Sequence, residues 1–169
     1  YVYYYIINIF FLLKAEGNCI WYGECGPSGQ GDNGVYNCKY TGPPKPQKNE
    51  TYLELLKDLC PHLYNENQDG SVDTCCDYSQ LVRYNHQLSV PRQLMSRCPA
   101  CFLNFRTFLC DFTCNPKQNE FMTITQEQDY NNNTQEVVSV NYYVTNSSVN
   151  QMYNSCVDVQ YSASNQKIM

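Results

Sequence analysis

Cys98 and Cys101 are the most obvious candidates for covalent chemistry, because Cys98-Pro99-Ala100-Cys101 has the C-x-x-C spacing of redox-active thiols. Such a pair needs a lowered thiol pKa, which the start of a helix supplies, and Pro99 is typical of a first helical turn. The chain contains 11 cysteines, however, and no βαβ pattern surrounds this pair. We therefore predict two structural half-cystines rather than a disulfide oxidoreductase.

Two further motifs resemble nucleotide and calcium sites. Gly29 to Gly34 matches G-x-G-x-x-G, but a dinucleotide fingerprint follows a strand and opens a helix. This copy lies between Cys25 and Cys38, in a predicted loop. Residues 65–73 resemble the start of an EF-hand loop, whose twelfth position must be a bidentate glutamate. That position is Cys76 in this chain. Neither motif therefore meets the requirements of its site, and we interpret both as turns.

Zinc and hydrolytic chemistry lack the residues they require. The two histidines, His62 and His86, stand away from any cysteine pair at ligand spacing. Ser28 is not part of a G-x-S-x-G elbow and has no histidine base near it in the sequence. We therefore assign no catalytic residue, metal or cofactor, and expect a binding domain.

The cysteines and the first residues indicate the secretory route. Residues 2–13 form an apolar run shorter than the ~20 residues that span a bilayer, and Ala15-Glu16-Gly17 is a small-x-small triplet of the kind that signal peptidase cuts. We expect residues 1–17 to be an N-terminally incomplete signal peptide and residues 18–169 to form one disulfide-rich domain. The odd cysteine count indicates a free thiol, an intermolecular disulfide or a partner lost by truncation, and we expect truncation, with the C-terminal part of this domain missing.

Charge and glycosylation signals agree with that compartment. The formal net charge is −5, whereas nucleic-acid binding needs a basic face, so no nucleic-acid partner is expected. N-x-[ST] sequons at Asn49, Asn132 and Asn146 predict glycans on a luminal or extracellular surface.

Apolar periodicity predicts helices followed by a small sheet. Repeats of three and four predict helices over residues 51–60, 77–88, 101–112 and 149–157. Period-two alternation predicts strands over residues 121–125 and 138–144, joined by a polar loop. The expected fold class is α+β, with helices packed around a small β-sheet in a single domain.

Capping signals define two of the expected helices. Asp77 and Gln80 stand at capping-box spacing, and so do Ser148 and Gln151. Pro91 is expected to end the helix that Asp77 begins.

Cysteine-anchored motifs follow one another in a specific order from Cys19 onward. They are Cys19-Ile20-Trp21-Tyr22-Gly23-Glu24-Cys25-Gly26, Tyr36-Asn37-Cys38, Gly42-Pro43-Pro44-Lys45-Pro46, Leu59-Cys60-Pro61, Cys75-Cys76-Asp77, Gln80-Leu81, Ser96-Arg97-Cys98-Pro99-Ala100-Cys101, Thr113-Cys114-Asn115-Pro116 and Met152-Tyr153-Asn154. This series closely resembles the N-terminal luminal domain of the Niemann-Pick type C cholesterol transporter family. The resemblance extends from Cys19 nearly to Met169.

The resemblance implies a disulfide pattern in which Cys98 has its partner outside this chain. The implied pairs are Cys19 with Cys75, Cys25 with Cys38, Cys60 with Cys110, Cys76 with Cys114, and Cys101 with Cys156.

The resemblance also implies a non-enzymatic sterol pocket. In that family the sterol hydroxyl lies deepest, and the residues that hold it correspond to Asn37 and Gln80, with Glu24 assisting through water. A carboxamide both donates to and accepts from a hydroxyl, so the implied chemistry is reasonable. Taken from the residues alone, Asn37 is a turn residue before a disulfide and Gln80 is a helix cap. The implied apolar wall is formed by Trp21, Tyr84 and Leu109.

Some residues of the implied pocket depart from the family pattern. Arg83 and Tyr84 are bulkier than the neighbours expected beside a sterol, and Leu109 stands where an aromatic ring is usual. The resemblance therefore does not define which sterol is preferred.

The resemblance implies a membrane-anchored parent protein of late endosomes and lysosomes that receives cholesterol or an oxysterol in the lumen. Its partner is the small soluble Niemann-Pick type C sterol carrier, which docks on a segment beyond Met169. The alternative is a disulfide-rich extracellular module that recognises a protein. A closed apolar cavity beside Asn37 and Gln80 favours the sterol, whereas a flat exposed aromatic patch favours the protein.

Overall fold

A computed structural model describes residues 17–28, 34–131, 133–160 and 167 of this chain. Its helices are α1 (Glu50–Leu59), α2 (Tyr78–Gln87), α3 (Ser89–Leu94), α4 (Pro99–Cys114) and α5 (Asn146–Cys156), with 3-10 turns at Pro61–Leu63 and Gln118–Glu120. Its strands are β1 (Trp21–Pro27), β2 (Val35–Lys39), β3 (Lys45–Gln47), β4 (Val72–Thr74), β5 (Met122–Asn131) and β6 (Thr134–Tyr142). The expected α+β fold class is confirmed.

Three sequence predictions concern residues outside the described ranges. These are nearly all of the expected signal peptide, all but the last residue of the glycine motif at residues 29–34, and the sequon at Asn132. The other two sequon asparagines are exposed: Asn49 caps α1, and Asn146 is the first residue of α5.

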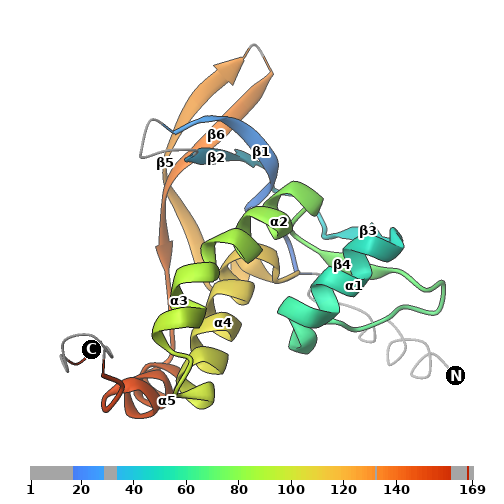
Figure 1. The fold of residues 1–169 in the computed structure, drawn as a ribbon. Helices are drawn as coiled ribbons and strands as arrows, with labels where there is room; N and C mark the ends of the chain where they lie inside the picture. The colour runs from blue at the N-terminus through green and yellow to red at the C-terminus, as the bar shows by residue number, and fades with distance from the viewer. Residues whose placement is uncertain (1–16, 29–33, 132, 161–166, 168–169) are drawn as a thin grey trace, which may run out of the picture.

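The main sheet is antiparallel, with strand order β1-β2-β6-β5, and a separate small sheet joins β3 to β4. Figure 1 shows the main sheet at one end of the molecule, with α2, α3 and α4 beneath it and α5 at the other end. The β5–β6 hairpin spans the distance between the two ends. The register places Glu24 opposite Asn37, and Asn37 opposite Val137, so these three residues form one row across the sheet.

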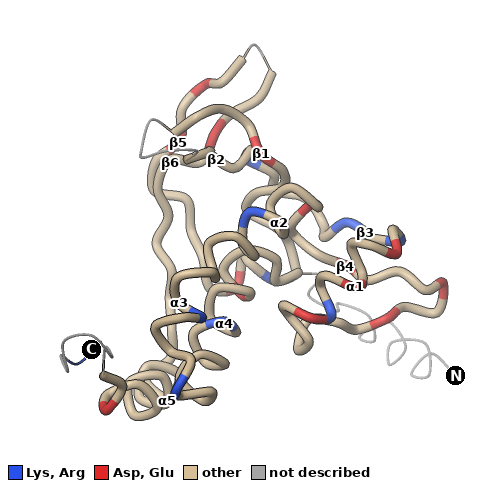
Figure 2. Tube along the Cα trace, viewed as in Figure 1, with Lys and Arg blue, Asp and Glu red and all other residues tan. Residues whose placement is uncertain are grey.

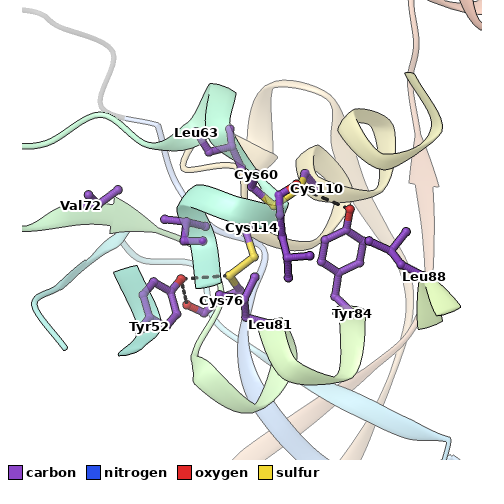
Figure 3. Close-up of a cluster of buried hydrophobic side chains, with 12 residues drawn as sticks. Tyr52, Cys60, Leu63, Val72, Cys76, Leu81, Tyr84, Leu88, Cys110 and Cys114 are labelled. Atoms are coloured by element: carbon purple, nitrogen blue, oxygen red, sulfur yellow. Dashed lines mark hydrogen bonds between the residues drawn. A yellow bond between two sulfur atoms is a disulfide. The ribbon is translucent and has the colours of Figure 1, made fainter. Parts of the chain in front are cut away.

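The largest buried cluster joins α1, α2 and α4 (Figure 3). Leu56 and Leu81 are fully buried in it, and so is the disulfide between Cys76 and Cys114. The hydroxyl of Tyr52 is also buried, and it donates to the Cys76 carbonyl oxygen at 3.0 Å. This bond satisfies a polar group that would otherwise destabilise the core.

A second buried cluster attaches the main sheet to α4. Trp21, Met122 and Val137 come from three strands, and Phe112 of α4 meets the Trp21 ring edge-on, with ring centroids 4.9 Å apart. Such aromatic contacts contribute roughly 0.5–1.5 kcal/mol beyond the apolar area that they bury.

Five disulfides cross-link the fold, and they are the pairs that the family resemblance implies. They join Cys19 to Cys75, Cys25 to Cys38, Cys60 to Cys110, Cys76 to Cys114, and Cys101 to Cys156. Cys98 carries a free thiol that donates to the Ser155 carbonyl oxygen at 3.2 Å. Because Cys101 is bonded to the last helix, it is not the partner of Cys98.

The loop predicted between Cys25 and Cys38 is wrong at both ends, because Trp21–Pro27 and Val35–Lys39 are paired strands. Two irregularities interrupt the register of this pair. They break the alternation of buried and exposed residues, which is the signal that identifies a strand in a sequence. Sequence periodicity therefore missed the two strands that carry Glu24 and Asn37.

Two predicted helix boundaries also need correction. Pro91 does not end helical structure, because it lies in the first turn of α3, where a missing N–H breaks no intrahelical bond. The last helix begins at Asn146 and not near Val149: the Thr145 hydroxyl accepts from the Ser148 backbone N–H at 3.1 Å. Ser148 therefore lies inside α5 and is not its cap.

The predicted strands are correct in kind but too short or displaced. β5 extends to Asn131 and β6 begins at Thr134, so the hairpin turn is tighter than the predicted loop. Most residues of β5 are exposed on both faces, which removes the alternation that would have revealed its length.

Removing the Cys101–Cys156 disulfide should destabilise the protein measurably. The double variant Cys101→Ser/Cys156→Ser loses a link that closes a long loop between α4 and α5, and its free energy of unfolding should fall by about 2–4 kcal/mol. Denaturant titration under non-reducing conditions measures this. Cys98→Ser is the matched control and should stay within about 0.5 kcal/mol of the parent. Equal losses in both variants would place Cys98 in a disulfide and contradict the pairing.

Candidate functional site

A pocket of about 390 Å³ lies where β1, β2 and β6 meet α2 and α4. Its volume falls within the ~300–1,000 Å³ typical of small-molecule sites. Five of the six residues expected to contact a sterol line it: Trp21, Asn37, Gln80, Tyr84 and Leu109. The structure therefore gathers residues from three distant parts of the sequence into one concave surface.

Gln80 provides the most buried polar group of the pocket, with 1% of its surface exposed. The capping box predicted for α2 is confirmed: Asp77 Oδ1 accepts from the Gln80 backbone N–H, and Gln80 Oε1 accepts from the Asp77 backbone N–H. Gln80 Oε1 also accepts from the Gly23 backbone N–H at 2.8 Å. One side chain thus caps α2 and joins it to β1.

Asn37 lies beside Gln80 on β2. Its Oδ1 accepts from Gln80 Nε2 at 2.9 Å and from an Arg83 Nη at 2.9 Å. Because a guanidinium can only donate, the Asn37 atom that faces it must be the amide oxygen. Among the described residues, no acceptor contacts Asn37 Nδ2.

Glu24 does not line this pocket. It lies in a neighbouring one that also contains Val35 and His86, and Arg83 separates the two. Arg83 Nε stands 3.1 Å from Glu24 Oε1, and an Arg83 Nη donates to the Val35 carbonyl oxygen at 2.9 Å. The ion pair is mostly shielded, with about a quarter of each side chain exposed: 23% for Arg83 and 25% for Glu24.

Arg83 is a functional candidate that the sequence shows only as a departure from the family pattern. It follows Gln80 by three residues on α2, and this spacing places two side chains on the same helix face. The spacing was visible in the sequence, but the partner strand was not, because β2 was predicted as a loop.

The apolar wall is formed by side chains whose polar atoms are satisfied elsewhere. The Trp21 indole N–H donates to the Thr113 carbonyl oxygen at 3.3 Å, and the Tyr84 hydroxyl donates to the Arg106 carbonyl oxygen at 2.8 Å. Burial raises the pKa of Tyr84 well above its ordinary range, so this hydroxyl stays neutral at physiological pH. Trp21 and Tyr84 are thus core residues that also line the pocket.

A second pocket of about 330 Å³ lies between α4, α5 and the far end of the β5–β6 hairpin. Its lining includes Asn104, Phe108, Phe121 and Tyr142. No residue expected to hold a sterol is among them, so its variants are matched controls for the first pocket.

Metal and membrane signals are absent from the described part of the chain. Within residues 17–28, 34–131, 133–160 and 167, no cluster of three or more His, Cys, Asp or Glu side chains is placed to hold a metal ion. No helix in those ranges has both the length and the apolar character needed to cross a bilayer.

These features define the protein as a disulfide-braced α+β domain with a mixed polar and apolar pocket. Residues 16–169 match the family model described as Niemann-Pick C1 N terminus, and the chain belongs to this family.

Several relatives carry names that describe cholesterol transport. Over 157 residues, which cover 90% of this chain, it is 41% identical to NPC intracellular cholesterol transporter 1 of Sus scrofa. It is 32% identical over 152 residues, or 87% of the chain, to NPC1-like intracellular cholesterol transporter 1 of Mus musculus. These alignments cover 12% and 11% of the two relatives, so the chain corresponds to a small part of their length.

Replacing the two pocket amides should affect stability very differently. Gln80→Ala removes the acceptor of two backbone N–H groups, at about 1–3 kcal/mol for each donor left buried without a partner. Asn37→Ala leaves one buried donor, Gln80 Nε2, without its acceptor, whereas Arg83 keeps Glu24 and Val35 as partners, so this variant should cost only about 1–2 kcal/mol. Denaturant midpoints measure the difference. Equal midpoints for the two variants would show that Gln80 is not a structural link.

Proposed function

We propose that this chain binds cholesterol or a related sterol in the pocket between β2, α2 and α4, with the polar end of the sterol at Asn37 and Gln80. The observation that carries the proposal is the convergence of Trp21, Asn37 and Gln80 on one pocket together with Tyr84 and Leu109. The names of the relatives agree with a sterol as the ligand.

The apolar wall and the polar end of the pocket contribute differently to sterol binding. Burial of a sterol's apolar body against Trp21, Tyr84 and Leu109 would contribute on the order of 10 kcal/mol before ordering costs, so apolar fit dominates affinity. The two amides determine orientation, because a hydroxyl placed at the apolar end would lose its hydrogen bonds. Glu24 is separated from the pocket by Arg83, so any assistance from it passes through that side chain or through water.

The compartment proposed is the lumen of late endosomes and lysosomes. The five disulfides are typical of the secretory route, and we propose glycans at the exposed Asn49 and Asn146. In this account residues 1–17 are a signal peptide, and residues 18–169 belong to the receiving domain of a membrane-anchored intracellular cholesterol transporter. The partner that delivers the sterol is the small soluble Niemann-Pick type C carrier.

The charge distribution gives no indication of a nucleic-acid ligand. Figure 2 shows Lys and Arg interleaved with Asp and Glu along the described chain, with no continuous basic stripe. A nucleic-acid partner is not proposed, because such partners need a basic face.

Replacing Asn37 should weaken sterol binding without unfolding the protein. Asn37→Ala leaves the apolar wall intact but removes a hydrogen-bond partner worth roughly 1–3 kcal/mol when buried, so affinity for labelled cholesterol should fall about tenfold. Titration after a folding check by circular dichroism measures this.

Asn104→Ala is the matched control, because Asn104 lines the second pocket. It should bind sterol like the parent. If Asn104→Ala alone weakened binding, the sterol would bind in the second pocket and not in the first. If the parent protein bound no sterol, the protein-recognition alternative would be favoured.

A further inference from the structure

At the polar end of the pocket, the side-chain hydrogen-bond acceptors already have partners, whereas several donors do not. Three side chains meet there: Asn37, Gln80 and Arg83. Asn37 Oδ1 accepts from Gln80 and from Arg83, so both of its lone pairs are occupied. Gln80 Oε1 accepts from the backbone N–H groups of Gly23 and Asp77, and its lone pairs are occupied as well.

What remains for a ligand at this end is a set of donors. Asn37 Nδ2 contacts no acceptor among the described residues, and Gln80 Nε2 is engaged on one side only, by Asn37 Oδ1. Arg83 carries donors and no acceptor, and within the described part of the chain it contacts Glu24, Val35 and Asn37. These three side chains therefore offer N–H groups and no free acceptor.

A hydroxyl suits such a site poorly. It can accept from the N–H groups, but its own hydrogen finds no acceptor on these three side chains, and a buried donor without a partner is costly. A carbonyl or a sulfate oxygen only accepts, so it can bind the N–H groups that these three side chains offer and leaves no donor of its own unpaired.

Arg83 is the residue that leaves this end of the pocket without a free side-chain acceptor on Asn37. Its guanidinium occupies the second lone pair of Asn37 Oδ1, which would otherwise accept from a ligand hydroxyl. Glu24, which lines the neighbouring pocket, balances the charge of Arg83 through the guanidinium Nε.

We propose that Arg83 sets the specificity of this pocket, so that it prefers a sterol whose polar end is an acceptor, a carbonyl or a sulfate ester, over one that ends in a hydroxyl. The proposal rests on the proposed function, because it concerns the head group of a sterol in the same pocket. It goes further by naming the chemical class of sterol head group that the pocket prefers.

The test compares ligands that share one apolar body and differ at the head group: cholesterol, cholestenone and cholesteryl sulfate. Competition against a labelled sterol should give the native protein an affinity for cholestenone or cholesteryl sulfate about tenfold above that for cholesterol. In Arg83→Met, Asn37 Oδ1 regains a free lone pair, and the preference should fall below about threefold or reverse. Arg97→Met removes the same charge from an exposed position, and it should keep the native preference.

Two further variants are needed. One separates the effect of the charge of Arg83 from that of its hydrogen bonds, and the other avoids the destabilisation that an unpaired carboxylate would cause. Glu24→Gln removes the counter-charge of Arg83, so affinity should rise for the sulfate and stay nearly constant for the ketone. The double variant Glu24→Gln/Arg83→Met avoids the unpaired carboxylate that Arg83→Met leaves, and it should show the same loss of preference.

The outcomes distinguish this proposal from the one it rests on. Saturable sterol binding in which the native protein prefers cholesterol, or a preference that Arg83→Met and the double variant leave unchanged, would overturn the role of Arg83 and leave sterol binding intact. Failure of the native protein to bind any of the three sterols would overturn both.

Discussion

The buried amide of Gln80 is the constraint on which the geometry of the pocket depends. Its oxygen must accept from two backbone N–H groups, at the start of α2 and in β1, and its nitrogen must donate to Asn37 on β2. A side chain that is 1% exposed cannot exchange these partners for water. The helix and both strands are therefore fixed relative to one another, and the polar end of the pocket is formed before any ligand arrives.

Helix α4 fixes the opposite wall through covalent bonds. Three disulfides hold it, through Cys101, Cys110 and Cys114, and they attach α5, the end of α1 and the segment before α2. Leu109 projects into the pocket from a helix that is tethered along its whole length. The pocket thus combines a hydrogen-bonded polar end with a wall that the disulfides keep in place. This suits a ligand recognised mainly by shape, because a preorganised wall lowers the cost of binding.

The sequence predicted the helices of this fold better than its sheet. Helices such as α1 and α2 repeat their apolar residues at three and four, so their existence and the Asp77–Gln80 cap could be predicted. β1 and β2 could not, because irregular register removes the alternation that marks a strand, and a cysteine-rich stretch resembles a loop. Asn37 and Gln80 were identified through family resemblance. Arg83 needed the structure, since its role depends on contacts with strands that were not predicted.

The most direct test of the account is photo-cross-linking with a sterol that carries a photoreactive group close to its polar end. The protein is labelled, digested after reduction, and the modified peptides are identified by mass spectrometry. The account predicts labelling of β2 and α2 at residues near Asn37, Gln80 and Arg83, competed by unlabelled sterol. Labelling confined to the second pocket, at Phe108, Phe121 or Tyr142, or labelling that excess sterol does not reduce, would contradict it.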